Sequence, residues 1–248
     1  MVAFKNNLAW KDFYEKSATS HMPEHSRLLF GSLSEVLKQR EFILKLIKKY
    51  FKKRYGLVFD VGCGTGRYLE KLSSLGWQTV GLDFSWAMIQ EAKTHKHSVF
   101  SQSFGENLGV KSGQADLVLC IEMLQTSDNP NAVISEAYRI LKPGGALILS
   151  TIRKISTYEL CFLPLAIIIE TDLSLKNAKW YYKLIKARDT LVWYDRPTLH
   201  PIKRYEVKCL YDMLKNNGFK CISGNYLGII NKIPWLLNSQ SIIIIAKK

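Results

Sequence analysis

The stretch Val58-Phe59-Asp60-Val61-Gly62-Cys63-Gly64-Thr65-Gly66 decides the fold. A short apolar run with an acidic residue near its end leads directly into a glycine-rich turn. Glycine adopts positive φ angles and lets a ligand approach the backbone closely, so this turn is typical of a ligand-binding α/β fold. A dinucleotide fingerprint starting at Gly62 would need a third glycine where Arg67 stands, and a P-loop would need a Gly-Lys-Ser/Thr sequence that does not follow.

Short apolar runs alternate with helical segments on both sides of this turn. Strands are predicted at 57–61, 79–82, 98–101, 117–121 and 146–151, with helices at 67–74, 85–93 and 131–141. Strands that are apolar throughout indicate a parallel sheet covered on both faces. A helix at 204–217, a strand from Phe219 and a β-branched strand at 241–246 end the pattern. We therefore expect a Rossmann-like, doubly wound, mostly parallel seven-stranded sheet with an antiparallel last strand.

The length of 248 residues suits a single domain. We expect an N-terminal helical cover at 1–55, with helix between 26 and 53, and a cofactor-binding core at 56–151. An aromatic-rich insertion on the substrate side should follow at 152–200, with helices at 157–169 and 174–188. The final helix and strands would occupy 201–248.

The net charge of +14 and the pI near 9.5 would suit nucleic acid or an anionic membrane. The lysines are mostly scattered, however. The one dense run, residues 45–54, has apolar residues at helical spacing, which is typical of the solvated face of an amphipathic helix.

The cysteines and apolar segments indicate a reducing compartment. Five cysteines, an odd number without a Cys-x-x-Cys pair, argue against a disulfide framework and a zinc site, so no metal is expected. The N-terminus lacks the apolar core of a signal peptide, and the most apolar run, 160–169, is interrupted by Pro164 and too short to span a bilayer. We expect a soluble, cytoplasmic protein.

Three further motifs follow the glycine-rich turn in order along the chain. They are Val80-Gly81-Leu82-Asp83-Phe84-Ser85, Phe104-Gly105-Glu106-Asn107-Leu108 followed by Ala115-Asp116-Leu117-Val118-Leu119, and Glu136-Ala137-Tyr138-Arg139-Ile140-Leu141-Lys142-Pro143-Gly144-Gly145. Together with residues 60–66, they resemble class I S-adenosylmethionine-dependent methyltransferases, particularly the small-molecule group related to ubiquinone and menaquinone biosynthesis enzymes. The resemblance covers residues 58–151 and fades beyond them.

The resemblance implies S-adenosyl-L-methionine as the cofactor. Asp60 would favour the cofactor's ammonium, Asp83 would accept both ribose hydroxyls, and Phe84 would pack near the adenine, while Ser85 has the character of a helix N-cap. The implied cofactor-binding residues are Asp60, Gly62, Cys63, Gly64, Gly66, Asp83, Phe84, Ser103, Phe104, Gly105, Glu106, Cys120 and Ile121.

Phe104 departs from the family pattern. Relatives often have an aspartate at this position that bonds the adenine amino group, and phenylalanine cannot accept that bond. Adenine recognition would then fall to backbone groups near residues 103–106 or be looser, at a cost of about 0.5–1.5 kcal/mol for one hydrogen bond.

Two residues are candidates for catalysis, and for each a structural role stays open. Glu122 follows the predicted strand 117–121 and would be a base, a metal contact or a structural carboxylate. His200 precedes the penultimate helix, as a histidine does in quinone-pathway relatives, and would deprotonate an acceptor hydroxyl. His21 and His25 are weaker candidates, as are His95 and His97 on an expected solvated turn.

Aromatic residues are the candidates for substrate binding. Tyr14 belongs to an N-terminal aromatic segment that relatives use as a lid, and Tyr181, Trp193 and Tyr194 would wall an apolar pocket in the insertion. Packing against the domain would explain the same residues.

The expected function is S-adenosylmethionine-dependent methyl transfer to a small, aromatic or apolar metabolite. One alternative is an RNA methyltransferase that uses the basic surface; no Asn/Asp-Pro-Pro-Tyr motif or appended RNA-binding module accompanies the charge. The second is a noncatalytic partner subunit, against which Gly62, Gly64 and Asp83 argue because they are intact.

Overall fold

A computed structural model describes residues 5–19, 33–51, 56–95, 98–152, 203–227 and 241–248, and all structural statements concern these residues. The helices are α1 (Lys5–Thr19), α3 (Leu33–Tyr50), α4 (Arg67–Ser73), α5 (Trp86–Ala92), η1 (Leu124–Thr126, a 3₁₀ turn), α6 (Pro130–Ile140) and α9 (Val207–Asn216). The strands are β1 (Leu57–Val61), β2 (Gln78–Asp83), β3 (Ser98–Gln102), β4 (Ala115–Ile121), β5 (Leu141–Ile152), β6 (Lys220–Leu227) and β7 (Ser241–Lys247).

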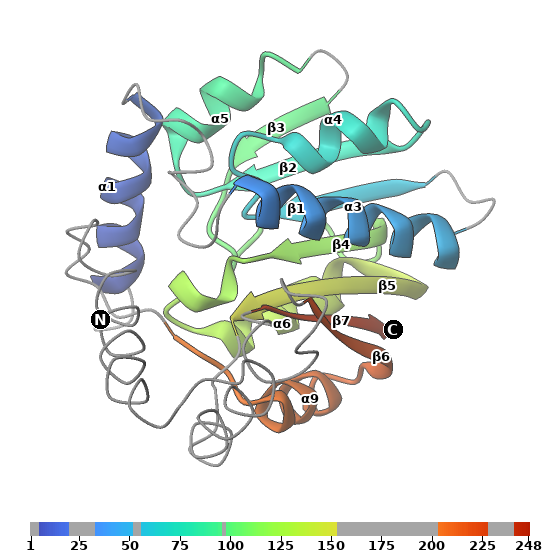
Figure 1. The fold of residues 1–248 in the computed structure, drawn as a ribbon. Coiled ribbons are helices and arrows are strands. Elements are labelled where there is room, and N and C mark those ends of the chain that lie inside the picture. The colour runs from blue at the N-terminus through green and yellow to red at the C-terminus, as the bar shows by residue number, and fades with distance from the viewer. Residues whose placement is uncertain (1–4, 20–32, 52–55, 96–97, 153–202, 228–240) are drawn as a thin grey trace, which may run out of the picture.

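The strands form one seven-stranded sheet in the order β3-β2-β1-β4-β5-β7-β6 (Figure 1). Neighbours from β3 to β5 pair in parallel, whereas β7 is antiparallel to both β5 and β6. The prediction of a mostly parallel doubly wound sheet with an antiparallel last strand is confirmed.

Both faces of the sheet are apolar, as the continuous strands predicted. In β4, Val118 and Cys120 join the core beneath α6 and α9, while Leu117 and Leu119 join the core beneath α3, α4 and α5. Alternate side chains point to opposite faces, so a strand that is buried on both sides must be apolar at every position.

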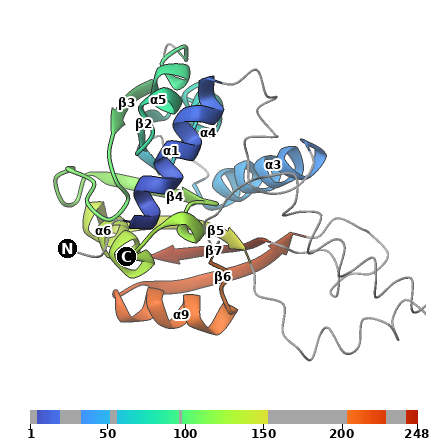
Figure 2. The same ribbon diagram turned by 90° about the vertical axis from the view of Figure 1, so that its left-hand side faces the viewer.

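Helix α1 lies across the carboxyl edge of the sheet. In Figure 1 the arrowheads of β4 and β5 point toward α1, and Figure 2 shows α1 in front of the strand ends. Its contacts with α5 and η1 place it over the edge where ligands bind in doubly wound folds.

The corner between α6 and β5 differs from the prediction. Helix α6 ends at Ile140 rather than 141, and β5 begins at Leu141 instead of 146, so the Lys-Pro-Gly-Gly segment belongs to the strand. Leu141 pairs with Ala115, and the register then shifts before Leu117 pairs with Ala146. This irregularity accommodates the proline, which lacks a backbone N–H for a regular ladder.

Candidate cofactor site

The glycine loop, residues 62–66, turns sharply between β1 and α4. Gly62, Gly64 and Gly66 have φ angles of 76°, 51° and 79°, a region that costs other residues strain. The backbone N–H groups of Gly62 and Cys63 both donate to Leu82 O, at 2.7 and 3.1 Å. These bonds fix the loop against the carboxyl end of β2.

The surroundings of the three glycines differ. A Cβ on Gly62 would lie 2.7 Å from Met123 Cβ, and one on Gly66 would lie 2.9 Å from the Phe100 ring. At Gly64 a Cβ would have no atom within 4 Å. The loop is therefore packed at its two ends and open at its tip, where a ligand can approach the backbone.

Asp83 at the end of β2 joins the glycine loop to α5. Its Oδ2 accepts a hydrogen bond from Gly64 N at 2.8 Å, and its Oδ1 accepts one from Ser85 N at 2.9 Å. Burial raises the pKa of Asp83 to about 6, although the bonds from Ser85 and Gly64 oppose this shift. The side chain expected on the ribose thus also positions the loop. Ser85 caps α5 as predicted, since its Oγ accepts from Met88 N.

Asp60 is buried at the end of β1. Its side chain is 1% exposed, and within the described part of the chain neither carboxylate oxygen has a hydrogen-bond partner. Burial, together with the nearby Asp83 charge, raises the pKa of Asp60 to about 8. An unsatisfied buried carboxylate is costly and is stabilised by a cationic donor, so the site fits the ammonium of an amino-acid moiety.

Aromatic side chains meet beside Asp83. The ring of Tyr14, from α1, lies 5.9 Å from that of Phe84, and Phe84 lies 6.1 Å from Phe104. The structure brings these three predicted residues together. It also reveals Glu15, which no local sequence pattern marks; its carboxylate accepts hydrogen bonds from two N–H groups at the start of α5.

The segment after β3 is held by polar contacts on both of its sides. Ser103 N donates to Asp83 O at 2.8 Å, and the Glu106 carboxylate accepts from Ser127 Oγ at 2.6 Å and Asp128 N at 3.1 Å. Gly105 is buried, and a Cβ there would lie 2.7 Å from Met123 Cε. These predicted residues shape the segment through its backbone.

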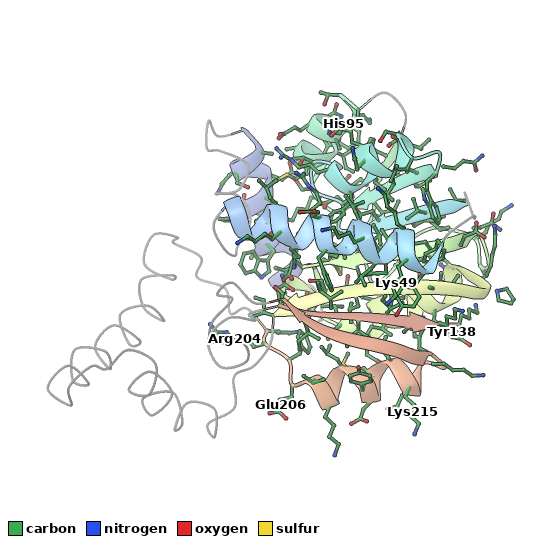
Figure 3. All side chains as sticks on the ribbon, turned by 45° about the vertical axis from the view of Figure 1, so that its right-hand side comes forward. Lys49, His95, Tyr138, Arg204, Glu206 and Lys215 are labelled. Atoms are coloured by element: carbon green, nitrogen blue, oxygen red, sulfur yellow. The ribbon has the colours of Figure 1, made fainter. Side chains whose placement is uncertain are left out.

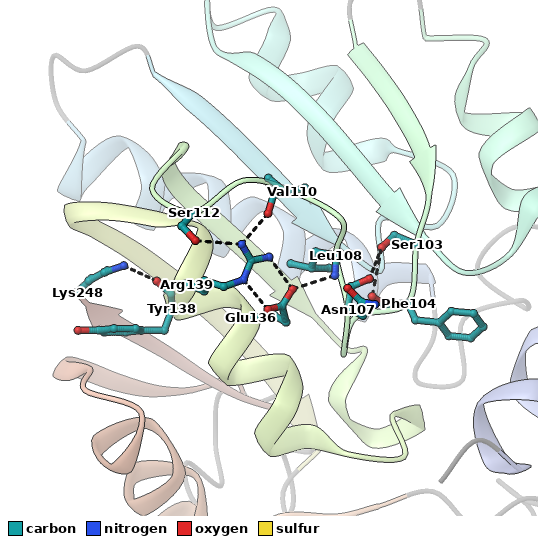
Figure 4. A network of polar contacts seen from close by, with 10 residues as sticks. All are labelled: Ser103, Phe104, Asn107, Leu108, Val110, Ser112, Glu136, Tyr138, Arg139 and Lys248. Carbon is teal, nitrogen blue, oxygen red and sulfur yellow. Dashed lines mark hydrogen bonds and ion pairs between the residues drawn. The ribbon is translucent and has the colours of Figure 1, made fainter. Parts of the chain in front are cut away.

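An ion pair on α6 stabilises the next part of this segment (Figure 4). Arg139 contacts Glu136 through two nitrogens, at 2.6 and 2.8 Å, and holds the pKa of Glu136 below its usual value. Glu136 accepts from Leu108 N at 3.0 Å, and Arg139 donates to Val110 O at 2.7 Å. The pair thus holds residues 108–112 against α6 through hydrogen bonds and has a structural role.

The end of β4 carries the predicted Cys120, Ile121 and Glu122. Cys120 is buried, and burial raises the pKa of its thiol. Glu122 is partly buried with a φ of 52°, and it is the one non-glycine residue with positive φ in the described ranges. Such strain is frequent at functional sites.

Glu122 accepts hydrogen bonds from several elements. Gln39 Nε2, from α3, donates to Oε1 at 2.7 Å, Gln125 Nε2 approaches Oε2 at 3.2 Å, and Ser150 Oγ donates to Oε1 as well. Burial raises the pKa of Glu122, and the bond from Ser150 is the largest opposing effect. Gln39 and Gln125 are partners that sequence reasoning missed.

His95 contacts the glycine loop. It lies after α5, as expected (Figure 3). Its side chain is only 24% exposed, however, and its Nε2 lies 3.0 Å from Thr65 O. The other histidines and the insertion aromatics fall outside the described residues: His21, His25, His97, His200, Tyr181, Trp193 and Tyr194.

Basic side chains stand on both faces of the sheet. Figure 3 shows Lys49 on α3 and Lys215 on α9, the helices that cover opposite faces. No group of three or more His, Cys, Asp or Glu side chains that could hold a metal occurs among the described residues. No helix in the described ranges is long and apolar enough to cross a membrane.

Comparisons with known proteins agree with this geometry. Residues 59–149 match the methyltransferase domain family. A ubiquinone biosynthesis O-methyltransferase from Escherichia coli O157:H7 is 28% identical over 204 residues, covering 75% of this chain and 85% of that protein. Its counterpart from Xanthomonas oryzae pv. oryzae is 37% identical over 103 residues, covering 39% and 43%.

A solved structure supports the same fold. Magnesium protoporphyrin IX methyltransferase from Synechocystis PCC 6803, with bound SAH, aligns with a TM-score of 0.63 at 18% identity, covering 99% of this chain and 96% of that one. The matched domain spans the glycine loop, Asp83 and the end of β4, the same features that converge at the carboxyl edge. Residues 59–149 form a methyltransferase domain of the class I S-adenosylmethionine-dependent type, with S-adenosyl-L-methionine as its cofactor, as the resemblance implied.

Proposed function

We propose that the chain methylates a small, aromatic or apolar metabolite. The observation that carries this proposal is the similarity to a ubiquinone biosynthesis O-methyltransferase over 85% of that protein's length. This match covers 75% of the chain and so extends beyond residues 59–149, the part that matches the methyltransferase domain family. An acceptor oxygen on a small molecule is the simplest reading.

The position of α1 supports a small acceptor. This helix crosses the carboxyl edge between α5 and η1, and its Tyr14 packs on Phe84. In our proposal residues 1–55 cover the cofactor, and residues 152–200 complete the acceptor side with Tyr181, Trp193 and Tyr194 as pocket walls. A covered edge admits a metabolite more readily than a folded RNA.

The proposed chemistry needs little from the protein beyond alignment. S-adenosylmethionine supplies an activated methyl group, and an in-line displacement is accelerated by orientation and exclusion of water. A base is needed only when the acceptor must lose a proton, and His200 is our candidate. The bonds from Gln39, Ser150 and Gln125 support a positioning role for Glu122 over that of a base.

Formation of S-adenosylhomocysteine with a panel of phenols, alcohols and amines, and separately with tRNA, tests the acceptor class. We expect turnover with a phenol or alcohol and none with tRNA. Methyl transfer to tRNA without turnover of any small acceptor would contradict the proposal. Failure of the protein to bind S-adenosylmethionine in calorimetry would instead indicate a noncatalytic partner subunit.

The role of His200 is tested by His200→Ala. We expect a lower kcat, loss of the rate increase near the ordinary histidine pKa of about 6.5, and unchanged cofactor affinity. An unimpaired rate on the true acceptor would remove His200 from the mechanism.

A further inference from the structure

His95 joins the end of α5 to the glycine loop. Its Nε2 lies 3.0 Å from Thr65 O, near the tip of the loop. A carbonyl oxygen only accepts hydrogen bonds, so the ring nitrogen donates and Nε2 carries a proton. The neutral ring makes this bond as its Nε2–H tautomer, and the protonated ring keeps the same donor. The bond therefore does not depend on the charge of the imidazole.

The bond orients the peptide group between Thr65 and Gly66. The C=O of this group accepts from His95, and its N–H, which belongs to Gly66, donates to Cys63 O at 3.0 Å. A peptide group is planar, so bonds at its C=O and at its N–H together set its orientation. One of these bonds lies inside the loop, and the other comes from the segment that follows α5.

The first part of the loop is held from β2. The N–H groups of residues 62 and 63 both donate to Leu82 O, and Gly64 N donates to Asp83 Oδ2 at 2.8 Å. The bond from His95 reaches the next residue, Thr65, from the other end of the following helix. The loop thus has two external anchors, the end of β2 and the end of α5.

The histidine ring is itself held in place. His95 N donates to Ala92 O at 3.0 Å, which ties the residue to the last turn of α5. On its other side, His95 Nδ1 lies 3.8 Å from Glu70 Oε1 of α4. A Cβ on Gly66 would lie 3.3 Å from Ala92 Cβ, so the end of α5 packs directly against the loop. The ring is therefore fixed between the loop, α4 and α5.

A loop of this composition depends on such anchors to keep one conformation. Gly62, Gly64 and Gly66 all have positive φ, and glycine loses more conformational freedom on ordering than any other residue. Among the described residues, no side chain caps the start of α4 at Gly66. A ligand that meets an ordered loop avoids the entropic cost of ordering it. An anchor on Thr65 O should therefore increase affinity for the ligand of the loop.

We propose that His95 is a positioning residue of the cofactor site, which holds the glycine loop in the conformation that receives S-adenosyl-L-methionine. It acts through Thr65 O, on the backbone of the loop. An N–H donor at this place is required, whereas the basicity of the imidazole is not. The proposal concerns cofactor binding and is independent of the acceptor that is methylated.

Calorimetric titration of the full chain with S-adenosylhomocysteine tests the need for a donor. His95→Phe keeps a ring without the N–H group and should weaken binding about fivefold, since one net hydrogen bond is worth a factor of roughly two to twelve. His95→Gln places a carboxamide N–H near the position of Nε2 and should bind within about twofold of the wild type. Equal affinities in the wild type and His95→Phe, or equal losses in the two variants, overturn the proposal.

Thr94→Val is the matched control. Thr94 precedes His95, and its exposed side chain donates from Oγ1 to Glu91 O at 2.8 Å, a bond within the end of α5. The variant thus removes one hydrogen bond to a backbone carbonyl at the same end of the helix, but not the bond to the loop. It should keep the wild-type affinity. A loss as large as that of His95→Phe would show that any disturbance of this helix end weakens binding, which contradicts the proposal.

Amide hydrogen exchange in the unliganded protein locates the effect without measuring affinity. In His95→Phe the N–H of Gly66 should exchange about fivefold faster, because its peptide group loses one of its two bonds. The N–H groups of Gly62 and Cys63, which donate to Leu82 O, should keep their wild-type rates. An unchanged rate at Gly66 would show that the loop does not depend on His95.

Discussion

The carboxyl ends of β1 and β4 lie side by side in the sheet, and a carboxylate stands at each. Asp60 in β1 is buried without a hydrogen-bond partner in the described part of the chain, whereas Glu122 after β4 accepts bonds from Gln39, Gln125 and Ser150. Hydrogen bonds within the protein therefore stabilise the Glu122 carboxylate, whereas Asp60 has no such bond among the described residues and would be stabilised by a cation. We propose from this difference that the ligand's positive group binds at β1, while the side chain after β4 has a positioning role.

The backbone conformation also differs between the ends of β1 and β4. Beyond β1 the positive φ angles fall on glycines, which leave the loop tip open, while beyond β4 the φ of 52° falls on Glu122 itself. A positive φ costs a residue with a Cβ roughly 1–2 kcal/mol. The fixed partners of the Glu122 carboxylate offset this strain.

The largest expected effect is that of Gly62→Ala. The added Cβ meets Met123 at 2.7 Å while φ is 76°, so steric and backbone costs combine. We expect the free energy of unfolding to fall by about 3 kcal/mol. Chemical denaturation measures this.

Gly113→Ala is the matched control for the backbone cost alone. Its φ is 68°, and a Cβ there meets nothing within 4 Å. We expect a loss of about 1 kcal/mol. Equal losses in the two variants would show that the Met123 contact imposes no constraint on the loop.

Glu122→Ala tests the contribution of the hydrogen bonds that the Glu122 carboxylate accepts. Removal of the carboxylate takes the acceptor from Ser150 Oγ and one of the two acceptors from each of Gln39 Nε2 and Gln125 Nε2, which should lower the free energy of unfolding by about 2 kcal/mol. Glu122→Gly should be roughly 1 kcal/mol more stable than Glu122→Ala, because glycine relieves the strain of the positive φ. Both are measured by denaturation. A glycine variant no more stable than the alanine variant would contradict a strained backbone.

The sequence predicted features that have a local signal. The strands were visible because each is a short apolar run, and Gly64 could be related to Asp83 because a glycine turn and an acid at the next strand end recur in such folds at a known spacing. The residues of the Pro-Gly-Gly segment before Ala146 favour turns and so predict a corner, yet pairing with β4 extends β5 through this segment.

Long-range polar contacts could not be predicted in this way. Gln39 and Glu122 are 83 residues apart, and Glu15 meets the start of α5 from a distance of 71 residues. No periodicity marks such pairs, because they depend on how whole helices are placed. That Asp60 has no hydrogen-bond partner among the described residues is likewise a property of the assembled edge.

The pH dependence of cofactor affinity tests the proposed role of Asp60. The pKa of Asp60 is raised to about 8, and a bound ammonium would lower it, so binding near neutral pH releases a proton. Affinity should increase about tenfold from pH 6.5 to 8, where one proton can contribute up to 1.36 kcal/mol per pH unit. Calorimetry across this range measures it, and Asp60→Asn should flatten the dependence.

The unliganded protein should respond to pH with the opposite sign. Folded Asp60 keeps a proton that the unfolded chain releases near pH 4, so stability should fall as the pH rises from about 4 to about 8. An affinity that is independent of pH in the wild type would place the ammonium away from Asp60.

The smallest expected effect is that of Asp83→Ala, which should weaken S-adenosylmethionine binding by about 1 kcal/mol or more. The variant loses the expected ribose contact together with the support of Gly64 N. Asp116→Ala is its control at the opposite edge of the sheet, where Asp116 accepts from Leu57 N and Lys142 Nζ. Both variants remove an aspartate with backbone and structural contacts, but only the first lies at the carboxyl edge. Equal cofactor affinities in the two variants, measured by calorimetry, would show that Asp83 supports the loop without contacting the ligand.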